Sequence, residues 1–108
     1  MRFSQGDIVV VELPFTDFSG SKRRPALVLN AVDLNRDLIV AKITKTPGKH
    51  RVPIFEEDME EGELAHYPSY VDVTSIFTSE KRFCKRVGRV SSAALERVKE
   101  ELRIVLGV

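Results

Sequence analysis

The sequence is poor in cysteine and lacks tryptophan: among 108 residues it has one cysteine, Cys84, and no tryptophan. A single cysteine can form neither a disulfide within the chain nor a zinc cluster of the usual kind, so we expect an intracellular, reducing compartment. Long hydrophobic runs are also missing, because no stretch approaches the roughly 18 apolar residues of a membrane span. The start, MRFSQGDIVVVELPF, has no apolar signal-peptide core. These absences predict a cytoplasmic protein.

Repeats, low-complexity tracts and linkers are absent as well. With 43% hydrophobic and 31% charged residues, the 108 residues have the composition of one ordinary globular unit. A chain of this length can bury a core without disulfides or metals, but it has no room for a second one. We therefore expect a single domain over residues 1–108.

The net charge of +1 excludes the strongly basic composition of a nucleic-acid packaging protein, but the charge is unevenly distributed. Residues 56–65 carry six acids and no base. Residues 1–55 carry nine Lys and Arg against five acids, and residues 66–108 carry eight against five. A basic face that binds a polyanion is therefore compatible with the nearly neutral total.

Short β-branched segments bounded by turn residues predict strands at 7–13, 25–30, 38–43, 52–55, 69–73 and 82–87. Residues 14–23 are rich in turn formers and predict a loop of about ten residues, a length typical of functional loops. Residues 56–66 are interpreted as an acidic turn or a short helix.

The end of the chain has the spacing of an amphipathic helix. Ser91 and Ser92 are candidate N-caps, and apolar residues then follow at helical intervals: Leu95, Val98, Leu102, Val105 and Leu106. Many short antiparallel strands and one terminal helix favour a small, mainly β barrel with the helix packed on one side or end.

The usual signatures of catalysis are missing. His50 and His66 are sixteen residues apart, neither has a second ligand at helical spacing, and Cys84 is distant from both, so no metal site is expected. Neither a glycine-rich phosphate loop nor a G-x-S-x-G elbow occurs. The remaining candidates are polar residues near strand ends, in the segments 22–24, 44–46 and 49–51.

Arg24 and Thr44 stand out among these residues. Arginine donates hydrogen bonds in a planar fork that fits a phosphate, and Arg24 directly precedes Pro25, which keeps its backbone extended. The alternative for the basic triplet 22–24 is a solvated turn. Thr44 ends a predicted strand, where it can equally be a β-favouring residue with no further role.

The segments GDIVVVELPF, SKRRPALVLN and AKIT, followed by the terminal helix, resemble the PemK/MazF-like toxin family of toxin–antitoxin systems. The most specific part is G-D-x-V-x-V, then a polar loop, then R-P-A-L-V. The resemblance runs along nearly the whole chain. It implies an SH3-like barrel with a C-terminal helix, a homodimer, metal-independent cleavage of single-stranded RNA without a cofactor, and neutralisation by a small acidic antitoxin.

The resemblance also implies roles for individual residues. Arg24 would contact the scissile phosphate or donate a proton, and Thr44 would orient that phosphate. The loop 14–23 would border the RNA groove. Independently of the resemblance, Phe15 and Phe18 in this loop are either core or loop anchors or rings on which bases stack. The remaining expected RNA-binding residues are Ser21, Lys22, Arg23, Lys45, Thr46, Lys49 and Arg51.

The implied reaction is attack of the RNA's 2′-hydroxyl on the adjacent phosphorus, which needs positioning, charge stabilisation and proton transfer from the protein. The stretch 69–80 departs from the family, since Asp72 and Thr74 stand where many relatives have a charged pair, and Phe77 where several have Arg. Asp72 is a possible base, or an outward polar residue of an alternating strand. A non-catalytic binding module or a CcdB-like gyrase-binding toxin is the alternative function.

Overall fold

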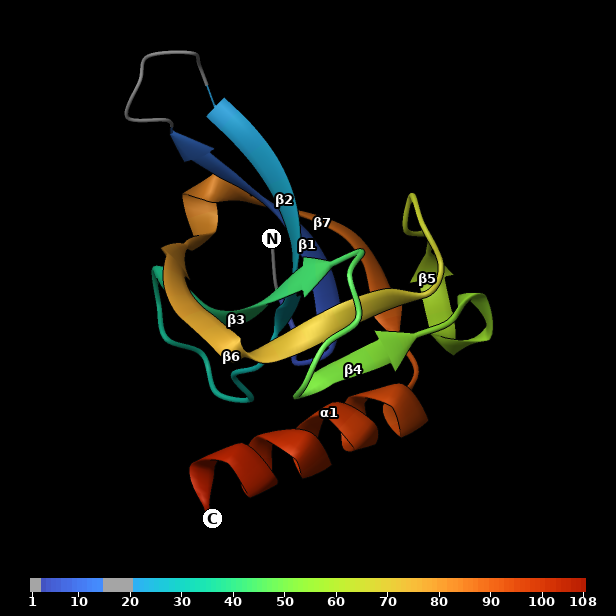
Figure 1. The fold of residues 1–108 in the computed structure, drawn as a ribbon. Helices are drawn as coiled ribbons and strands as arrows, with labels where there is room; N and C mark the ends of the chain where they lie inside the picture. Colours follow the sequence, from blue (N-terminus) through green and yellow to red (C-terminus); the bar gives the residue numbers. More distant parts are fainter. Residues whose placement is uncertain (1–2, 15–20) are drawn as a thin grey trace.

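The computed structural model describes residues 3–14 and 21–108, which form a curled antiparallel sheet and one α-helix (Figure 1). The strands are β1 (Asp7–Pro14), β2 (Ser21–Val28), β3 (Asp37–Thr44), β4 (Arg51–Ile54), β5 (Met59–Gly62), β6 (Ser69–Glu80) and β7 (Cys84–Val90). Short 3-10 helices cover Glu56–Asp58 and Lys81–Phe83, and α1 spans Ser92–Leu106.

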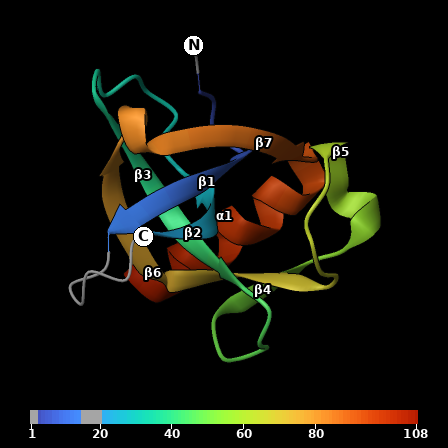
Figure 2. The ribbon, with the colours of Figure 1, turned by 90° about the horizontal axis from the view of Figure 1, so that it is seen from above.

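Within these residues the strands join in one sheet with the order β4-β6-β3-β2-β1-β7-β5, and every pair is antiparallel. Viewed from above, the sheet curls so strongly that β7 lies on one side of the molecule and β4 on the opposite side (Figure 2). The expected mainly β fold with a C-terminal helix is confirmed.

Three of the predicted boundaries are wrong. Ser21 to Arg23 belong to β2 and not to a loop, because their backbone pairs with β1, with Arg23 opposite Glu12. The acidic segment after residue 56 forms a 3-10 helix and then β5, which pairs with β7. The strand predicted at 69–73 is longer, since β6 runs on to Glu80, and its register shifts where β3 has an irregularity between Ala41 and Ile43.

The two faces of the sheet bury two apolar clusters, since side chains alternate along each strand. Ile8 and Leu27 pack on the face that also receives Ala94 and Val98 of α1. Val9 and neighbouring side chains fill the other face, where Phe77 and Cys84 pack against them. β1 is therefore buried on both faces, as its continuous apolar sequence predicts.

Helix α1 begins at one of its two predicted N-caps and ends at a glycine. The Ser91 hydroxyl accepts a hydrogen bond from the backbone N–H of Ala94 at 3.2 Å. At the other end Gly107 adopts a left-handed conformation, φ 73°, which only glycine adopts without steric cost. The helix packs beneath β4 and β6 (Figure 1), so it leaves the upper ends of β2 and β3 uncovered.

Candidate functional site

The candidate site lies where β2 and β3 separate. Their ladder runs from Val28 opposite Val40 to Ala26 opposite Lys42 and goes no further. The next residue of β2 is Pro25, which has no N–H to donate to a neighbouring strand. On its other edge β3 pairs with β6 from Asp37 to its end, where Thr44 lies opposite Tyr70. The divergence opens a hollow between the two strand ends.

This hollow has a volume of about 510 Å³. Its polar lining combines both expected catalytic residues with three of the expected RNA-binding residues, namely Arg23, Arg24, Thr44, Lys45 and Thr46. Another side is lined by Leu64, Ala65 and His66 of the loop between β5 and β6 and by Ser69, the first residue of β6. The fold therefore places Arg24 and Thr44 at one hollow, although 19 residues lie between them in the sequence.

Arg24 and Thr44 have side chains suited to an anion. In the described part of the chain Arg24 has no carboxylate partner, so its guanidinium is available to a ligand. The Thr44 hydroxyl accepts from the backbone N–H of Thr46 at 3.4 Å, which leaves its own hydrogen to donate. Arginine and hydroxyl donors on facing strand ends can hold a phosphate between them.

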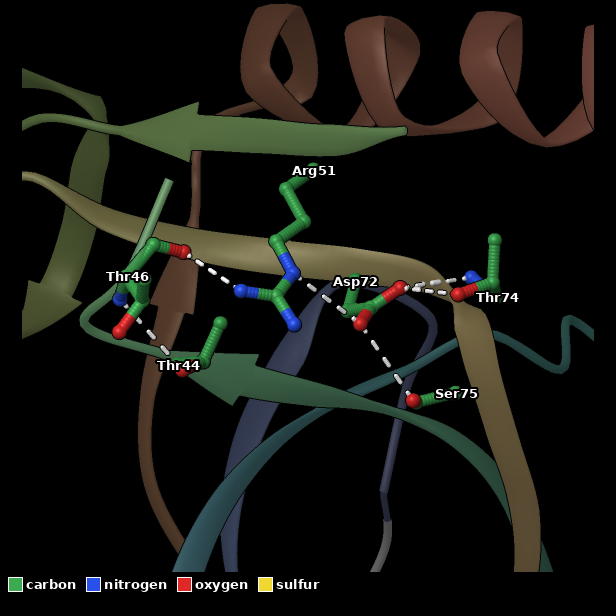
Figure 3. Close-up of polar contacts among 6 residues, drawn as sticks. All are labelled: Thr44, Thr46, Arg51, Asp72, Thr74 and Ser75. Carbon is green, nitrogen blue, oxygen red and sulfur yellow. Dashed lines mark hydrogen bonds and ion pairs between the residues drawn. The ribbon is translucent and has the colours of Figure 1, made fainter. Parts of the chain in front are cut away.

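Arg51 and Asp72 form a brace between β4 and β6 that reaches Thr46 (Figure 3). Nε of Arg51 donates to Oδ2 of Asp72 at 3.2 Å, and its Nη1 donates to the carbonyl oxygen of Thr46 at 2.9 Å. Oδ1 of Asp72 accepts from both the hydroxyl of Thr74, at 2.6 Å, and its N–H, at 2.9 Å. The brace therefore ties the segment after Thr44 to β6.

Asp72 is only 4% exposed, so it is not an outward polar residue of an alternating strand. Burial raises the pKa of Asp72, but the hydrogen bonds from Thr74 and the ion pair with Arg51 lower it by more, and the pKa falls below its ordinary value. A carboxylate that keeps its charge so firmly is a weak proton acceptor. Its geometry suits holding Arg51 in place.

A second brace connects α1 to the same region. Nδ1 of His50 lies 2.7 Å from Oε2 of Glu101. His50 has φ 61°, a left-handed conformation that is costly for a residue with a Cβ, and its carbonyl accepts from Val73 N–H at 3.2 Å. The helix thus fixes the residue that directly precedes Arg51.

Some of the expected RNA-binding residues do not line this hollow. Lys49 is exposed on the turn before β4 and does not line the hollow. The side chains of Ser21 and Lys22, together with Phe15, Phe18 and the rest of residues 15–20, lie outside the described residues. A second, smaller hollow of about 430 Å³ shares Arg23 with the first and extends over β1 and β7, lined by Arg82, Phe83 and Lys85 among others.

Sequence reasoning missed the loop between β5 and β6. His66 was weighed only as a metal ligand, yet the fold carries it into the hollow with Arg24 and Thr44. His66 begins the turn-rich sequence HYPS, and this position in a loop between two strands was the sequence signal that could have indicated a site residue. In the described residues no group of three or more His, Cys, Asp or Glu side chains could hold a metal ion.

Cys84 is not a candidate nucleophile. Burial raises the pKa of its thiol above the ordinary value, although a hydrogen bond involving Ser79 acts in the other direction. The thiolate, which is the reactive form, is therefore disfavoured.

No helix in the described part of the chain is long and apolar enough to cross a membrane.

Comparison with protein families gives one match, which covers residues 4–106: the PemK-like, MazF-like toxin of type II toxin-antitoxin systems. The chain therefore belongs to this toxin family. A comparison with curated proteins finds no match.

Solved structures have the same fold. An endoribonuclease from Mycobacterial species has a TM-score of 0.76 and 18% identity, covering 98% of this chain and 92% of the other. MazE-MazF (Form-II) from Deinococcus radiodurans has a TM-score of 0.73 and 18% identity over 100% and 98%. A Mycobacterial endoribonuclease in complex with its cognate antitoxin has a TM-score of 0.71 and 18% identity over 98% and 94%. At this identity the likeness establishes the fold.

Proposed function

We propose that this toxin is an endoribonuclease that cleaves single-stranded RNA without a metal ion, in the hollow between the ends of β2 and β3. The observation that carries this proposal is the joint placement of Arg24 and Thr44 in one basic hollow of a chain that belongs to a toxin family. The name of a similar structure, an endoribonuclease, supports the same activity.

In the proposed reaction the 2′-hydroxyl of the RNA attacks the adjacent phosphorus and gives a 2′,3′-cyclic phosphate. Arg24 stabilises the negative charge that grows on the phosphate oxygens, because arginine keeps its proton and offers two parallel donors. Thr44 donates to the same phosphate and orients it. Since the nucleophile belongs to the substrate, the protein supplies positioning and charge stabilisation.

Arg23, Lys45 and Thr46 line the hollow beside the reacting phosphate and are proposed to contact its neighbours. Ser21, Lys22 and Lys49 remain proposed contacts with the RNA strand. Arg51 is proposed to act with Asp72, which holds its guanidinium, and so to keep Thr46 in position. This arrangement favours a positioning role for Asp72 over that of the base.

The single strand is proposed to continue across β2 toward Phe83 and Lys85. These residues line the adjoining hollow, which shares Arg23 and Pro25 with the first. Phe83 is 45% exposed, and Arg82 lies over its ring at 4.6 Å from the centroid. Aromatic rings next to basic side chains are typical of surfaces that bind single strands.

A small acidic antitoxin is proposed to occupy the same basic hollow and to compete with RNA, because negative charge favours both ligands there. A similar structure contains an endoribonuclease with its cognate antitoxin. Simultaneous binding of antitoxin and RNA would contradict this competition.

The protein is proposed to act as a homodimer. Three apolar side chains near the C-terminus are exposed, namely Ile104 and Leu106 in the last turn of α1 and Val108 after it, at 64%, 58% and 85%, and contact with a second copy would cover some of them. Light scattering at micromolar concentration should give twice the chain mass, and a monomer would contradict the proposal.

The activity is tested by incubating the purified protein with a defined single-stranded RNA in EDTA and mapping the product ends. We expect cleavage that survives chelation, with 2′,3′-cyclic phosphate and 5′-hydroxyl ends. Chelator-sensitive cleavage contradicts the mechanism. Salt-sensitive RNA binding without cleavage, or binding to gyrase, indicates a binding module instead, because phosphate contacts do not require catalysis.

A further inference from the structure

We propose that His66 is the general base that removes the proton from the attacking 2′-hydroxyl. This inference rests on the proposed function and identifies a residue of the same hollow that carries the proton. His66 lines the hollow together with Arg24 and Thr44, although it comes from a different segment, the loop between β5 and β6.

The reaction requires a proton acceptor that the other charged groups of the hollow do not provide. Among residues 3–14 and 21–108, the titratable side chains that line it are Arg23 and Arg24 from β2, Lys45 after β3, and His66 itself. Arginine does not lose its proton in proteins, and lysine is normally an ammonium with no lone pair. Asp72 does not line the hollow, and its lone pairs are held by Arg51 and Thr74.

The loop fixes the imidazole in a proton-accepting form. Nδ1 of His66 lies 3.2 Å from the carbonyl oxygen of Pro68. A carbonyl oxygen can only accept, so Nδ1 carries the hydrogen, and in the neutral ring Nε2 is left as the acceptor. An imidazole held in this way has the tautomer that general-base catalysis requires.

The loop itself is held by short hydrogen bonds. The Ser69 hydroxyl donates to the carbonyl oxygen of His66 at 2.6 Å. The backbone N–H of Leu64 donates to the Tyr67 hydroxyl at 2.7 Å. These contacts use backbone atoms of His66 and Leu64, so the imidazole can be replaced without removing them.

In the proposed step one bond to phosphorus forms while another breaks, and the proton that is released has an acceptor. The 2′-oxygen forms a bond to phosphorus while the bond from phosphorus to the 5′-oxygen breaks. The proton of the 2′-hydroxyl passes to Nε2 of His66, and the leaving 5′-oxygen takes a proton from solvent water. Arg24 and Thr44 hold the phosphate throughout, and no redox change occurs.

The test is the pH dependence of kcat/KM for His66→Gln and for His50→Gln, on one single-stranded RNA in EDTA. His50 is the matched control, because it is the other of the two histidines and is tied to Glu101 outside the hollow. We expect wild type to gain activity as the pH rises, because a general base works only in its unprotonated form. His66→Gln should lose this rise and about 10²-fold or more of the rate, while His50→Gln keeps the rise.

Chemical rescue supplies a readout that a structural role would not move. We expect added imidazole to restore part of the activity of His66→Ala, while KM and the circular dichroism spectrum stay close to wild type. If His66→Gln and His66→Ala retain the wild-type rate and pH rise, the inference is wrong and the nuclease proposal stands. If wild type cleaves no RNA, the proposed function itself fails.

Discussion

The arginines of β7 and those of β2 have the same chemistry and opposite surroundings. Arg86 and Arg89 both pair with the buried Asp7, at 3.2 and 2.9 Å, and both also pair with Glu61. The hydrogen bond to Glu61 raises the pKa of Arg86, with further support from Asp7. Arg23 and Arg24 have no such carboxylate pair in the described part of the chain.

The difference shows which basic residues are available to a polyanion. A cation that is already neutralised contributes to folding, whereas one without a partner at the mouth of a hollow attracts an anion. The sequence places both groups in basic stretches, and only the fold distinguishes them. The acidic segment 56–65 that seemed to mask the basic charge provides Glu61, which neutralises β7.

The largest effect is expected from Asp7→Ala. Asp7 is 1% exposed and also accepts from the backbone N–H of Ser4 at 2.8 Å, so its loss removes the shared partner of Arg86 and Arg89. We expect the free energy of unfolding to fall by about 3–5 kcal/mol, measured by urea denaturation. An unchanged unfolding midpoint would place Asp7 among the dispensable surface charges.

Arg24→Ala should act on the rate and not on stability. We expect a loss of roughly 10²-fold in kcat, the scale of a removed transition-state donor, with little change in the unfolding midpoint. Arg89→Ala is the matched control, for which we expect lower stability and an unchanged rate per folded molecule. If both variants lose activity alike, the comparison between β2 and β7 does not hold.

Asp72→Asn is expected to have an intermediate effect. We expect a change in rate of less than about tenfold, below the 10² to 10⁴ of a lost general base. The free energy of unfolding should fall by about 1–3 kcal/mol, because Arg51 and Thr74 lose a charged acceptor. Abolished cleavage with intact RNA binding would make Asp72 the base.

The same variant has a pH signature. Because folding lowers the pKa of Asp72, its carboxylate contributes its full stability above the pKa of an unfolded aspartate, about 3.9. This contribution is lost as the pH falls through the lower pKa of the folded state. The stability difference between wild type and Asp72→Asn should therefore shrink in acid, and a difference that grows below about pH 4 would contradict the assignment.

Glu101→Gln should have the smallest effect. It removes the charge opposite His50 in a half-exposed pair, so we expect a loss of about 0.5–1 kcal/mol and at most a twofold to threefold change in rate. Glu100→Gln, on an exposed neighbouring position of α1, should leave both quantities unchanged. Equal effects of the two variants would mean that the helix does not brace the residue before Arg51.

Much of this fold was predictable from the sequence, because its signals are local. The apolar run of β1 and the spacing from Leu95 to Val105 predicted a strand buried on both faces and an amphipathic helix. The polar segment of β2 was read as a loop, because pairing with β1, and not local preference, makes Ser21 to Arg23 a strand. The hollow itself depends on where Pro25 ends a ladder, which no spacing in the sequence reveals.

The site was predictable only where the family pattern covers it. Arg24 and Thr44 were candidates by residue type and position, the resemblance implied their roles, and the fold places them in one hollow. His66 was not weighed for this site, since its approach depends on the path of the chain between β5 and β6. The burial of Asp72 depends on its contacts with Arg51 and Thr74, which alternation along β6 could not predict.

The central claim is that Arg24 and Thr44 act on one phosphate, and a double-mutant cycle tests it most directly. Single-turnover cleavage is measured for wild type, Arg24→Ala, Thr44→Ala and the double variant on the same RNA. We predict that the double variant is scarcely slower than Arg24→Ala alone, because residues that act as a unit are not additive. Fully multiplicative losses, or single variants as fast as wild type, would contradict a shared phosphate in this hollow.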